Sequence, residues 1–435
     1  MLFKRERGGI KMKHSFWRNR NFVTFFSANA LSNLGNWFDF VAVLILFRYT
    51  WQADPLLIAL IPVMYAIPSI LLGQFAGVFA DRKDKLKILV YSDWVRGVLT
   101  LVLVFTPFPF LALALIFLRN TAGAISLPAQ QGLVRRIVEE EDIMKAVTIN
   151  GSLFQLVKVV GPLIGGSLTA AFSPSFSIAI NSASFLLSGV ILLFIRPKKQ
   201  EEGEQKEKQG EDVGFWTSWK EGWSFVLKSR ILTASLLYGI VTTLTIQMID
   251  AQFVTLFSEV FPERAELTGW VISAIGIGSL LVVLALNKLD GIKKYGWFFG
   301  TASLLIGVMT GGFGFLNAST FLFVVIGLAL LGGIGNGLAF TAVNYLIQKE
   351  PPKEAIGRVS GIVDSTLSLL FIIGPLLGGL FIHQFGVATA FKIIGFSLVG
   401  VGSLGIVFQN LIWRRSIPHA NEPVKSREVQ VNSNA

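Results

Sequence analysis

The chain is a series of long apolar stretches separated by short polar segments. Each stretch reaches about the 20 residues that an α-helix needs to cross a bilayer. In the first half the stretches cover 22–48, 55–80, 88–107, 109–133, 145–171 and 174–195. In the second half they cover 231–257, 267–287, 296–316, 319–347, 356–384 and 387–412. This pattern predicts an all-α integral membrane protein with about twelve transmembrane helices.

The polar segments divide the chain into two predicted six-helix bundles, at 22–195 and 231–412. A segment at 1–21 precedes the first bundle, and a tail at 413–435 follows the second. The connection at 196–230 begins with a charged run that cannot bury apolar surface, so we expect a linker there. It ends with aromatic residues interleaved with charged ones, the pattern of an amphipathic helix on a membrane surface. These aromatic residues are Phe215, Trp216, Trp219, Trp223 and Phe225.

The composition excludes several classes of function. Hydrophobic residues make up 52% and charged residues 15% of the chain, whereas charged residues are about 25% of soluble domains. Cysteine is absent, which excludes disulfides, thiolate metal sites and cysteine nucleophiles. The three histidines, His14, His383 and His419, are scattered, and no phosphate-binding G-x-x-x-x-G-K-[ST] loop is present. The sequence therefore predicts no enzyme, no ATP-driven pump, no metal site and no cofactor.

The net charge of +11 could indicate a nucleic-acid partner, but the basic residues alternate along the chain instead of gathering in one region. Counted over alternate interhelical segments and both termini, 32 of the 38 Lys and Arg fall on one predicted side of the membrane. Basic residues near helix ends stay cytoplasmic. We therefore expect a multi-pass protein of the cell membrane with both termini in the cytoplasm, in contact with lipid and not with nucleic acid.

One hexapeptide occurs twice, at Gly161–Gly166 and at Gly374–Gly379, 213 residues apart. Two copies in the same orientation predict parallel repeats, related by an axis along the membrane normal, with a binding site between the halves. Small residues let helices approach closely and proline bends a helix, so we expect hinge and packing surfaces. Tight packing alone explains the residue types, although it does not explain the matched pair. The positions are Gly161, Pro162, Gly165, Gly166, Gly374, Pro375, Gly378 and Gly379.

The polar loop after the second apolar stretch has the features of a gate. Gly77 would allow a close helix contact one turn before Asp81, and this acid could pair with Arg82 or with the positive end of a neighbouring helix. Lys85 completes the predicted gating set. The alternative is a simple basic cytoplasmic loop with an incidental acid.

Three motifs resemble those of the major facilitator superfamily, and the resemblance covers roughly residues 20–412. Residues 77–87 resemble the signature G-x-x-x-D-R-x-G-R-[RK], with Asp84 in place of the second glycine. Residues 115–123 resemble L-x-x-x-R-x-x-Q-G, with Ala122 in place of glutamine. The Gly161–Gly166 segment resembles the core of an antiporter motif. The resemblance implies a twelve-helix secondary transporter working by alternating access, and we expect a monomer.

The first apolar stretch, Lys158 and the Glu221-Gly222 pair resemble the macrolide-efflux branch of the drug and proton antiporters. This resemblance implies export of small amphipathic or hydrophobic compounds in exchange for protons. Siderophore and lysophospholipid carriers are similar, so export or flipping of such molecules stays open. A uniporter and a non-transporting membrane sensor are further alternatives.

Ionisable residues inside the membrane cost about 2.5 to 3.5 kcal/mol each on insertion scales, so they usually face a cavity or a partner. Arg119 and Lys158 fall near the middle of their stretches, and Asp39 and Asp250 toward the outer third. A shift of 213 places the image of Asp39 two positions from Asp250, which predicts two carboxylates at similar depth. We expect one of them to exchange a proton, with Arg119 as the cation. A static salt bridge among Asp39, Arg119 and Lys158 is the alternative.

Other polar residues within the stretches are sparse, which is typical of a small-molecule cavity. Asp93, Arg96 and Asp364 lie nearer the cytoplasmic side and are interpreted as a gating network. The predicted cavity-lining residues are Gln155, Gln247, Gln252, Asn336 and Asn344.

Overall fold

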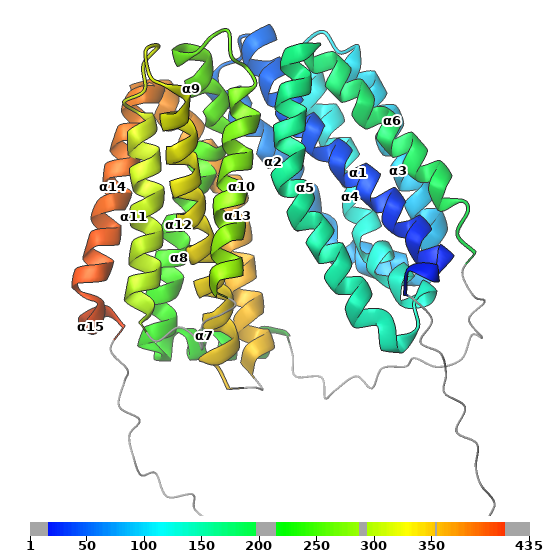
Figure 1. Cartoon of the computed structure of the whole chain (residues 1–435). Coiled ribbons are helices and arrows are strands. Elements are labelled where there is room, and N and C mark those ends of the chain that lie inside the picture. The colour runs from blue at the N-terminus through cyan, green and yellow to red at the C-terminus, as the bar shows by residue number, and fades with distance from the viewer. Residues whose placement is uncertain (1–15, 197–214, 287–293, 353–354, 414–435) are drawn as a thin grey trace, which may run out of the picture.

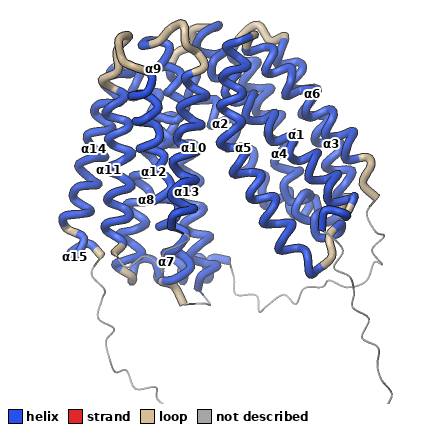
Figure 2. Tube along the Cα trace, in the orientation of Figure 1, coloured by secondary structure: helices blue, strands red, loops and turns tan. Residues whose placement is uncertain are grey.

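The computed structural model describes residues 16–196, 215–286, 294–352 and 355–413. Within these ranges the regular secondary structure is entirely helical (Figure 2). The predicted linker run at 197–214, most of the segment at 1–21, the loop at 287–293 and nearly all of the tail at 413–435 lie outside the described residues.

The first half of the chain forms six long helices. They are α1 (Arg20–Ile45), α2 (Pro55–Arg82), α3 (Lys85–Val104), α4 (Pro109–Ile137), α5 (Ile143–Ala171) and α6 (Pro174–Leu192). Three short turns accompany them: η1 (Phe16–Arg18), the π-helical η2 (Leu46–Thr50) and η3 (Glu140–Asp142). Proline at the first position begins α2, α4 and α6, where its missing N–H costs nothing.

The second half repeats this plan with a broken first helix. It contains α7 (Phe215–Lys228), α8 (Arg230–Ile249), η4 (Asp250–Gln252), α9 (Phe253–Val260), α10 (Leu267–Leu286), α11 (Tyr295–Phe313), α12 (Leu322–Lys349), α13 (Ile356–Phe385), α14 (Val387–Val407) and α15 (Gln409–Ile412). The single helix predicted at 231–257 is thus interrupted by the 3-10 turn at Asp250.

Eleven helical segments of the described chain are long and apolar enough to cross a membrane. The α3 helix is absent from this set although it has 20 residues and packs against α4 and α6. Its charged residues, Lys85, Lys87, Asp93 and Arg96, lower its mean hydropathy. With α3 included, the described helices form the predicted twelve-helix, all-α membrane fold.

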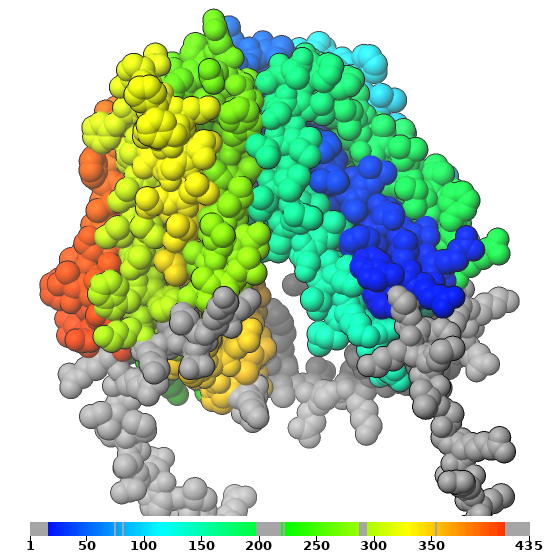
Figure 3. Space-filling view, viewed as in Figure 1, coloured from blue at the N-terminus to red at the C-terminus, as the bar shows by residue number. Residues whose placement is uncertain are grey.

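The helices assemble into two bundles, one from each half of the chain (Figure 1). The bundles meet at the top of the view, beside α9, and we call this the closed side. They separate toward the bottom, where α7 and α15 lie, and we call this the open side. A space-filling view shows a hollow between the halves on the open side (Figure 3). The described ends of the chain, at Phe16 and Trp413, also lie on the open side.

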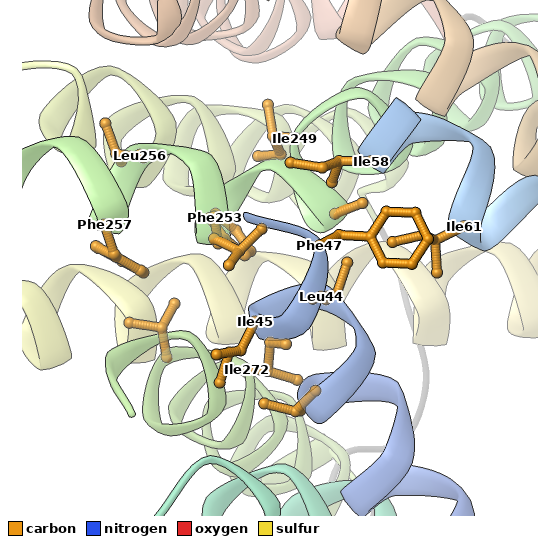
Figure 4. Close-up of a cluster of buried hydrophobic side chains, with 14 of the residues drawn as sticks. Leu44, Ile45, Phe47, Ile58, Ile61, Ile249, Phe253, Leu256, Phe257 and Ile272 are labelled. Carbon is orange, nitrogen blue, oxygen red and sulfur yellow. The ribbon is translucent and has the colours of Figure 1, made fainter. Parts of the chain in front are cut away.

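Buried apolar side chains join the halves at the closed side. One cluster there combines residues of α1, η2 and α2 with residues of α8, α9 and α10 (Figure 4). Among the described residues, two further clusters each belong to a single half. The apolar core therefore holds the bundles together at one end and leaves them separate at the other.

The aromatic segment predicted as an amphipathic helix forms α7, which packs against α8 and α13. Val226 is buried there, and Gly222 lies against Ile362 and Arg358 of α13. Trp219 and Phe225 remain exposed on the other face. One face of α7 is thus fixed to the second bundle at the open side.

Candidate functional site

The two Gly-Pro segments lie in α5 and α13, and each packs its helix against the first helix of its own half. A Cβ atom added to Gly161 would lie 2.5 Å from Cβ of Trp37, and one added to Gly165 would lie 2.7 Å from Cα of Phe38. In the second half, Gly374 lies against Gln247 in the same way, and Gly378 against the backbone of Met248. A larger residue at any of these positions would force α5 or α13 away from its neighbour.

The last glycine of each segment faces the opposite half. A Cβ on Gly166 would lie 3.0 Å from Cα of Gly269 in α10, and a Cβ on Gly379 would lie 3.2 Å from Cα of Leu56 in α2. Leu56 and Gly269 are themselves 213 residues apart. The junction between the halves is therefore built twice, by α5 with α10 and by α13 with α2, from matching residues.

Polar contacts reinforce the closed side across the same junction. Arg48 of η2 forms an ion pair of 3.0 Å with Glu259 of α9. Asp54, which caps the start of α2, lies 2.8 Å from Nδ1 of His383 in α13. In addition, the Gln252 amide donates to the carbonyl oxygen of Pro55 at 2.9 Å. These contacts connect segments more than 190 residues apart.

The apolar cluster in Figure 4 lies beside these contacts. Phe47 from the first half and Phe253 and Phe257 from the second have exposed fractions of 0%, 1% and 0%. Burying one large apolar side chain stabilises by about 1.5 to 3 kcal/mol, whereas an exposed ion pair contributes about 0.2 to 1 kcal/mol. The apolar side chains thus contribute more to closure than the ion pairs do.

A buried charge cluster lies inside the first half. The Arg119 guanidinium in α4 is 2.7 Å from Oδ2 of Asp39 in α1, and the two side chains are 2% and 0% exposed. Tyr65 of α2 donates its hydroxyl hydrogen to Asp39 at 2.9 Å and accepts a hydrogen bond from Arg119 at 2.6 Å. The other carboxylate oxygen of Asp39, Oδ1, has no hydrogen-bond partner among the described residues. Three helices are therefore tied together by one charged pair and one hydroxyl.

A second charged pair lies nearby in α3. Arg96 and Asp93 are 3.4 Å apart, and Asp93 also accepts a 2.6 Å hydrogen bond from Ser188 of α6. Arg96 donates to Asn36 of α1 at 3.0 Å. The network predicted to involve Asp93 and Arg96 thus lies within the first bundle, whereas Asp364 of the second bundle is exposed.

Asp250 has different surroundings from Asp39, contrary to the expectation of two equivalent carboxylates. Asp250 is partly exposed at the start of η4, and the cation that acts on it is Lys158 of α5, in the other half. Lys158 is exposed and takes no part in the Asp39–Arg119 pair, so the three-residue salt bridge considered above is not formed.

The reason lies in the register of the repeat. Trp37 and Gln247 contact equivalent glycines, and these two residues are 210 positions apart, not 213. With this shift the image of Asp39 is Ile249, which is buried. Adjacent residues on a helix point about 100° apart, so Asp250 faces a different direction from Asp39.

The gating loop is only partly as predicted. A Cβ on Gly77 would meet no described atom within 4 Å, so the predicted close helix contact at Gly77 is wrong for this arrangement of the halves. The bundles are apart on the open side, where the end of α2 lies. Arg82 is exposed, and the Lys85 side chain packs against Gly132 of α4. The side chain of Asp81 lies outside the described part of the structure.

The residues predicted to line a cavity fall into two groups. Gln247 and Gln252 are buried in the packing and in the junction described above, so their assignment to a cavity surface is wrong. Their amides serve the junction because α8 turns into η4 there. The other three stay accessible: Gln155 and Asn344 are exposed, and Asn336 is partly exposed.

Sequence reasoning missed Tyr65 and Gly269. Tyr65 lies in an apolar stretch without any motif, and its image in the second half is Gly278, so the repeat gave no signal for it. Gly269 could have been found, because it lies next to the start of the eighth apolar stretch at the image of Leu56. Among the described residues no group of three or more His, Asp or Glu side chains could hold a metal ion.

Comparison with known proteins identifies relatives of the whole chain. The family model described as Major Facilitator Superfamily matches residues 22–370 and 264–430. An uncharacterized MFS-type transporter, YfiS of Bacillus subtilis (strain 168), is 30% identical over 408 residues, which cover 91% of this chain and 95% of YfiS. Macrolide efflux protein A of Streptococcus pyogenes is 23% identical over 392 residues, which cover 88% and 94% of the two chains.

The fold also matches solved structures. The crystal structure of the nucleoside transporter NupG aligns with a TM-score of 0.69 at 12% identity, over 92% of this chain and all of that chain. At this identity the likeness concerns the fold alone.

Proposed function

The chain belongs to the Major Facilitator Superfamily and is a multi-pass secondary transporter, not an enzyme, and from this premise we propose that it exports small amphipathic or hydrophobic compounds in exchange for protons. Macrolide efflux protein A, a relative over most of the chain, supports this substrate class. The single observation that carries the proton coupling is the buried Asp39–Arg119 pair, whose only further described hydrogen bonds are to Tyr65 and Thr100.

Proton binding at Asp39 would change the charge balance of the first half. A neutral Asp39 would leave the Arg119 charge uncompensated in a buried site, which is unfavourable unless the surroundings rearrange. Protonation would therefore be linked to movement of α1, α2 and α4, the helices that hold the three side chains. Asp250 and Lys158, from different halves, would sense the relative position of the bundles.

The arrangement of the bundles supports alternating access. A contact that is tight at one end and open at the other gives a central space that is accessible from one side. The small residues at Gly166 and Gly269 offer a smooth surface on which the bundles could rock. We assign the open side to the cytoplasm, because Arg82, Arg135 and Arg136 lie at helix ends on that side.

The test is transport by purified protein in liposomes under an imposed pH gradient. The probes are a glycosylated macrolide, its aglycone, a lysophospholipid and a siderophore, because these represent the compounds carried by related transporters. We expect uphill movement of a macrolide that collapses when the gradient is dissipated. In Asp39→Asn, movement should lose its dependence on the gradient, whereas Asp142→Asn, at an exposed acid, should behave as the unmodified protein.

Each other result changes the proposal in a defined way. Full gradient dependence in both Asp39→Asn and Asp250→Asn would refute coupling through these acids. Movement without any effect of pH would identify a uniporter. Selective movement of the lysophospholipid or siderophore would reassign the substrate, and no movement of any probe would refute export.

A further inference from the structure

A polar recess lies inside the first bundle, toward the open side. It has a volume of about 230 Å³ and is enclosed by α1, α3, α4 and α6, with Ser69 contributed by α2. Its lining is dominated by neutral amide and hydroxyl side chains, which can both donate and accept hydrogen bonds. The amide residues are Asn29, Asn33, Asn36, Asn120 and Gln130.

The deep end of the recess holds an incompletely satisfied arginine. Arg96 donates to Asn36 and pairs with Asp93, and its guanidinium lies 3.9 Å from the centre of the Phe185 ring. Its Nε atom is buried and has no hydrogen-bond partner among the described residues. Buried donors are usually satisfied, so a free one at the wall of a cavity indicates a place for an acceptor. Because Asp93 offsets the Arg96 charge, that acceptor need not be charged.

The fold itself does not require this polar lining. In the second half, the images of Asn29 and Gln130 are Gly239 and Val343, and a Cβ on Gly239 would lie 3.7 Å from Val343. In the first half, Gln130 and Asn29 form a hydrogen bond at the same place. The corresponding space in the second half is lined almost entirely by apolar side chains. The same helices thus pack around an apolar lining in one half and a polar lining in the other.

The size of the recess limits what it can hold. Drug-sized ligands occupy pockets of about 300 to 1,000 Å³, and one water molecule takes about 30 Å³ of liquid volume. A space of 230 Å³ is too small for a whole compound of that class and much larger than one water needs. It fits one polar part of a larger molecule, whose remainder would lie in the hollow between the bundles.

We propose that this recess binds a neutral, hydroxyl- or amide-bearing part of the transported molecule, such as a sugar ring. The proposal rests on the transport function proposed above and adds a specificity site within one half. Asn36 lies one turn before Asp39 on α1, and Asn120 follows Arg119 on α4. A ligand at the deep end of the recess therefore lies next to the buried acid pair.

The test compares two variants of the recess with a matched control. Asn120→Leu and Asn33→Leu remove amide groups from the lining at similar side-chain size. Thr121→Val is the control, because Thr121 and Asn120 each donate to a backbone carbonyl four residues earlier on α4 and Thr121 does not line the recess. Asn120→Gln and Asn33→Gln, which keep an amide, show whether a loss reflects misfolding.

The probes are a macrolide that carries its sugars and the aglycone of the same macrolide. We expect the unmodified protein to prefer the glycosylated probe, and Asn120→Leu to weaken its binding about tenfold, the effect of one or two lost hydrogen bonds. Binding of the aglycone and the behaviour of Thr121→Val should not change. Equal loss for both probes, or no loss in either leucine variant, would overturn the assignment.

A labelling experiment separates this proposal from the transport function. Because the chain contains no cysteine, Asn33→Cys introduces a single site for a hydrophilic maleimide. We expect the glycosylated macrolide to slow labelling at least tenfold and the aglycone to have no such effect. Transport of the macrolide without protection of Asn33→Cys would refute the recess and leave the transport function standing. If neither probe binds or moves, both proposals are refuted.

Discussion

Trp37 of α1 and Gln247 of α8 occupy equivalent places, each against the first glycine of the Gly-Pro segment of its half. The glycines, Gly161 and Gly374, are 213 residues apart, but Trp37 and Gln247 are 210 apart. The second half therefore has three more residues between its first and second membrane helices than the first half has. This difference turns Asp250 out of the direction in which Asp39 points.

The first prediction compares removal of charge at these two acids. Asp39→Asn should destabilise the protein by about 3 to 5 kcal/mol, because it leaves the Arg119 charge buried and unpaired. Asp250→Asn should cost about 1 kcal/mol or less, since Asp250 is partly exposed and its interaction with Lys158 is weakened by solvent. Thermal unfolding in detergent, followed by circular dichroism, measures both.

A double variant provides the control for that comparison. Asp39→Asn combined with Arg119→Gln should recover part of the lost stability, because no unpaired charge then remains. If the two substitutions were simply additive, the pair would not interact energetically. That result would contradict the coupling inferred from the 2.7 Å contact.

The helices and their order could be predicted because hydropathy depends on local composition. The apolar run suggested that the third helix begins at 88, but α3 begins at Lys85, because the Asp84 carboxylate accepts hydrogen bonds from the next two turns' leading N–H groups, Leu86 and Lys87. The Asp39–Arg119 contact was anticipated from the scarcity of charges in the stretches. Tyr65 was not, since a tyrosine in an apolar run carries no signal of its own.

The register between α1 and α8 could not be predicted from the repeat. The matched hexapeptides fix the shift for α5 and α13, and the connection between α8 and α10 absorbs three extra residues in a region of uniform hydropathy. Hydropathy gives the depth of a residue in the membrane and not the direction of its side chain. For that reason Asp250 was placed at the right depth and on the wrong face.

The second prediction concerns glycines at tight and open positions. Gly165→Ala and Gly378→Ala should each cost about 1 to 3 kcal/mol, because the new Cβ would meet the backbone of Phe38 or Met248. Gly151→Ala on α5 is the matched control, since its Cβ would meet no described atom within 4 Å. Thermal unfolding of the three variants measures the difference. An equal loss in all three would show that helix propensity and not packing decides the effect.

The third prediction concerns the interaction of Lys158 with Asp250 across the halves. Lys158→Asp and Asp250→Lys should each lower the transport rate, because each places two like charges at the junction. The double variant, with the charges exchanged, should transport faster than either single variant. Rates in liposomes measure all three, and a double variant that transports at the product of the two single losses would show that the residues act independently.

The fourth prediction compares the ion pair and the apolar cluster that close the same side of the protein. Arg48→Gln should change the ratio of closed to open molecules by at most about fivefold, because an exposed ion pair contributes about 1 kcal/mol or less. Phe257→Ala, at a fully buried site in the cluster, should change it far more, since truncating a buried phenylalanine costs about 3 to 5 kcal/mol. Two cysteines introduced across the closed side into this cysteine-free chain allow spin-label distances to be measured. A larger population of long distances in Arg48→Gln than in Phe257→Ala would show that charge, and not apolar burial, controls closure.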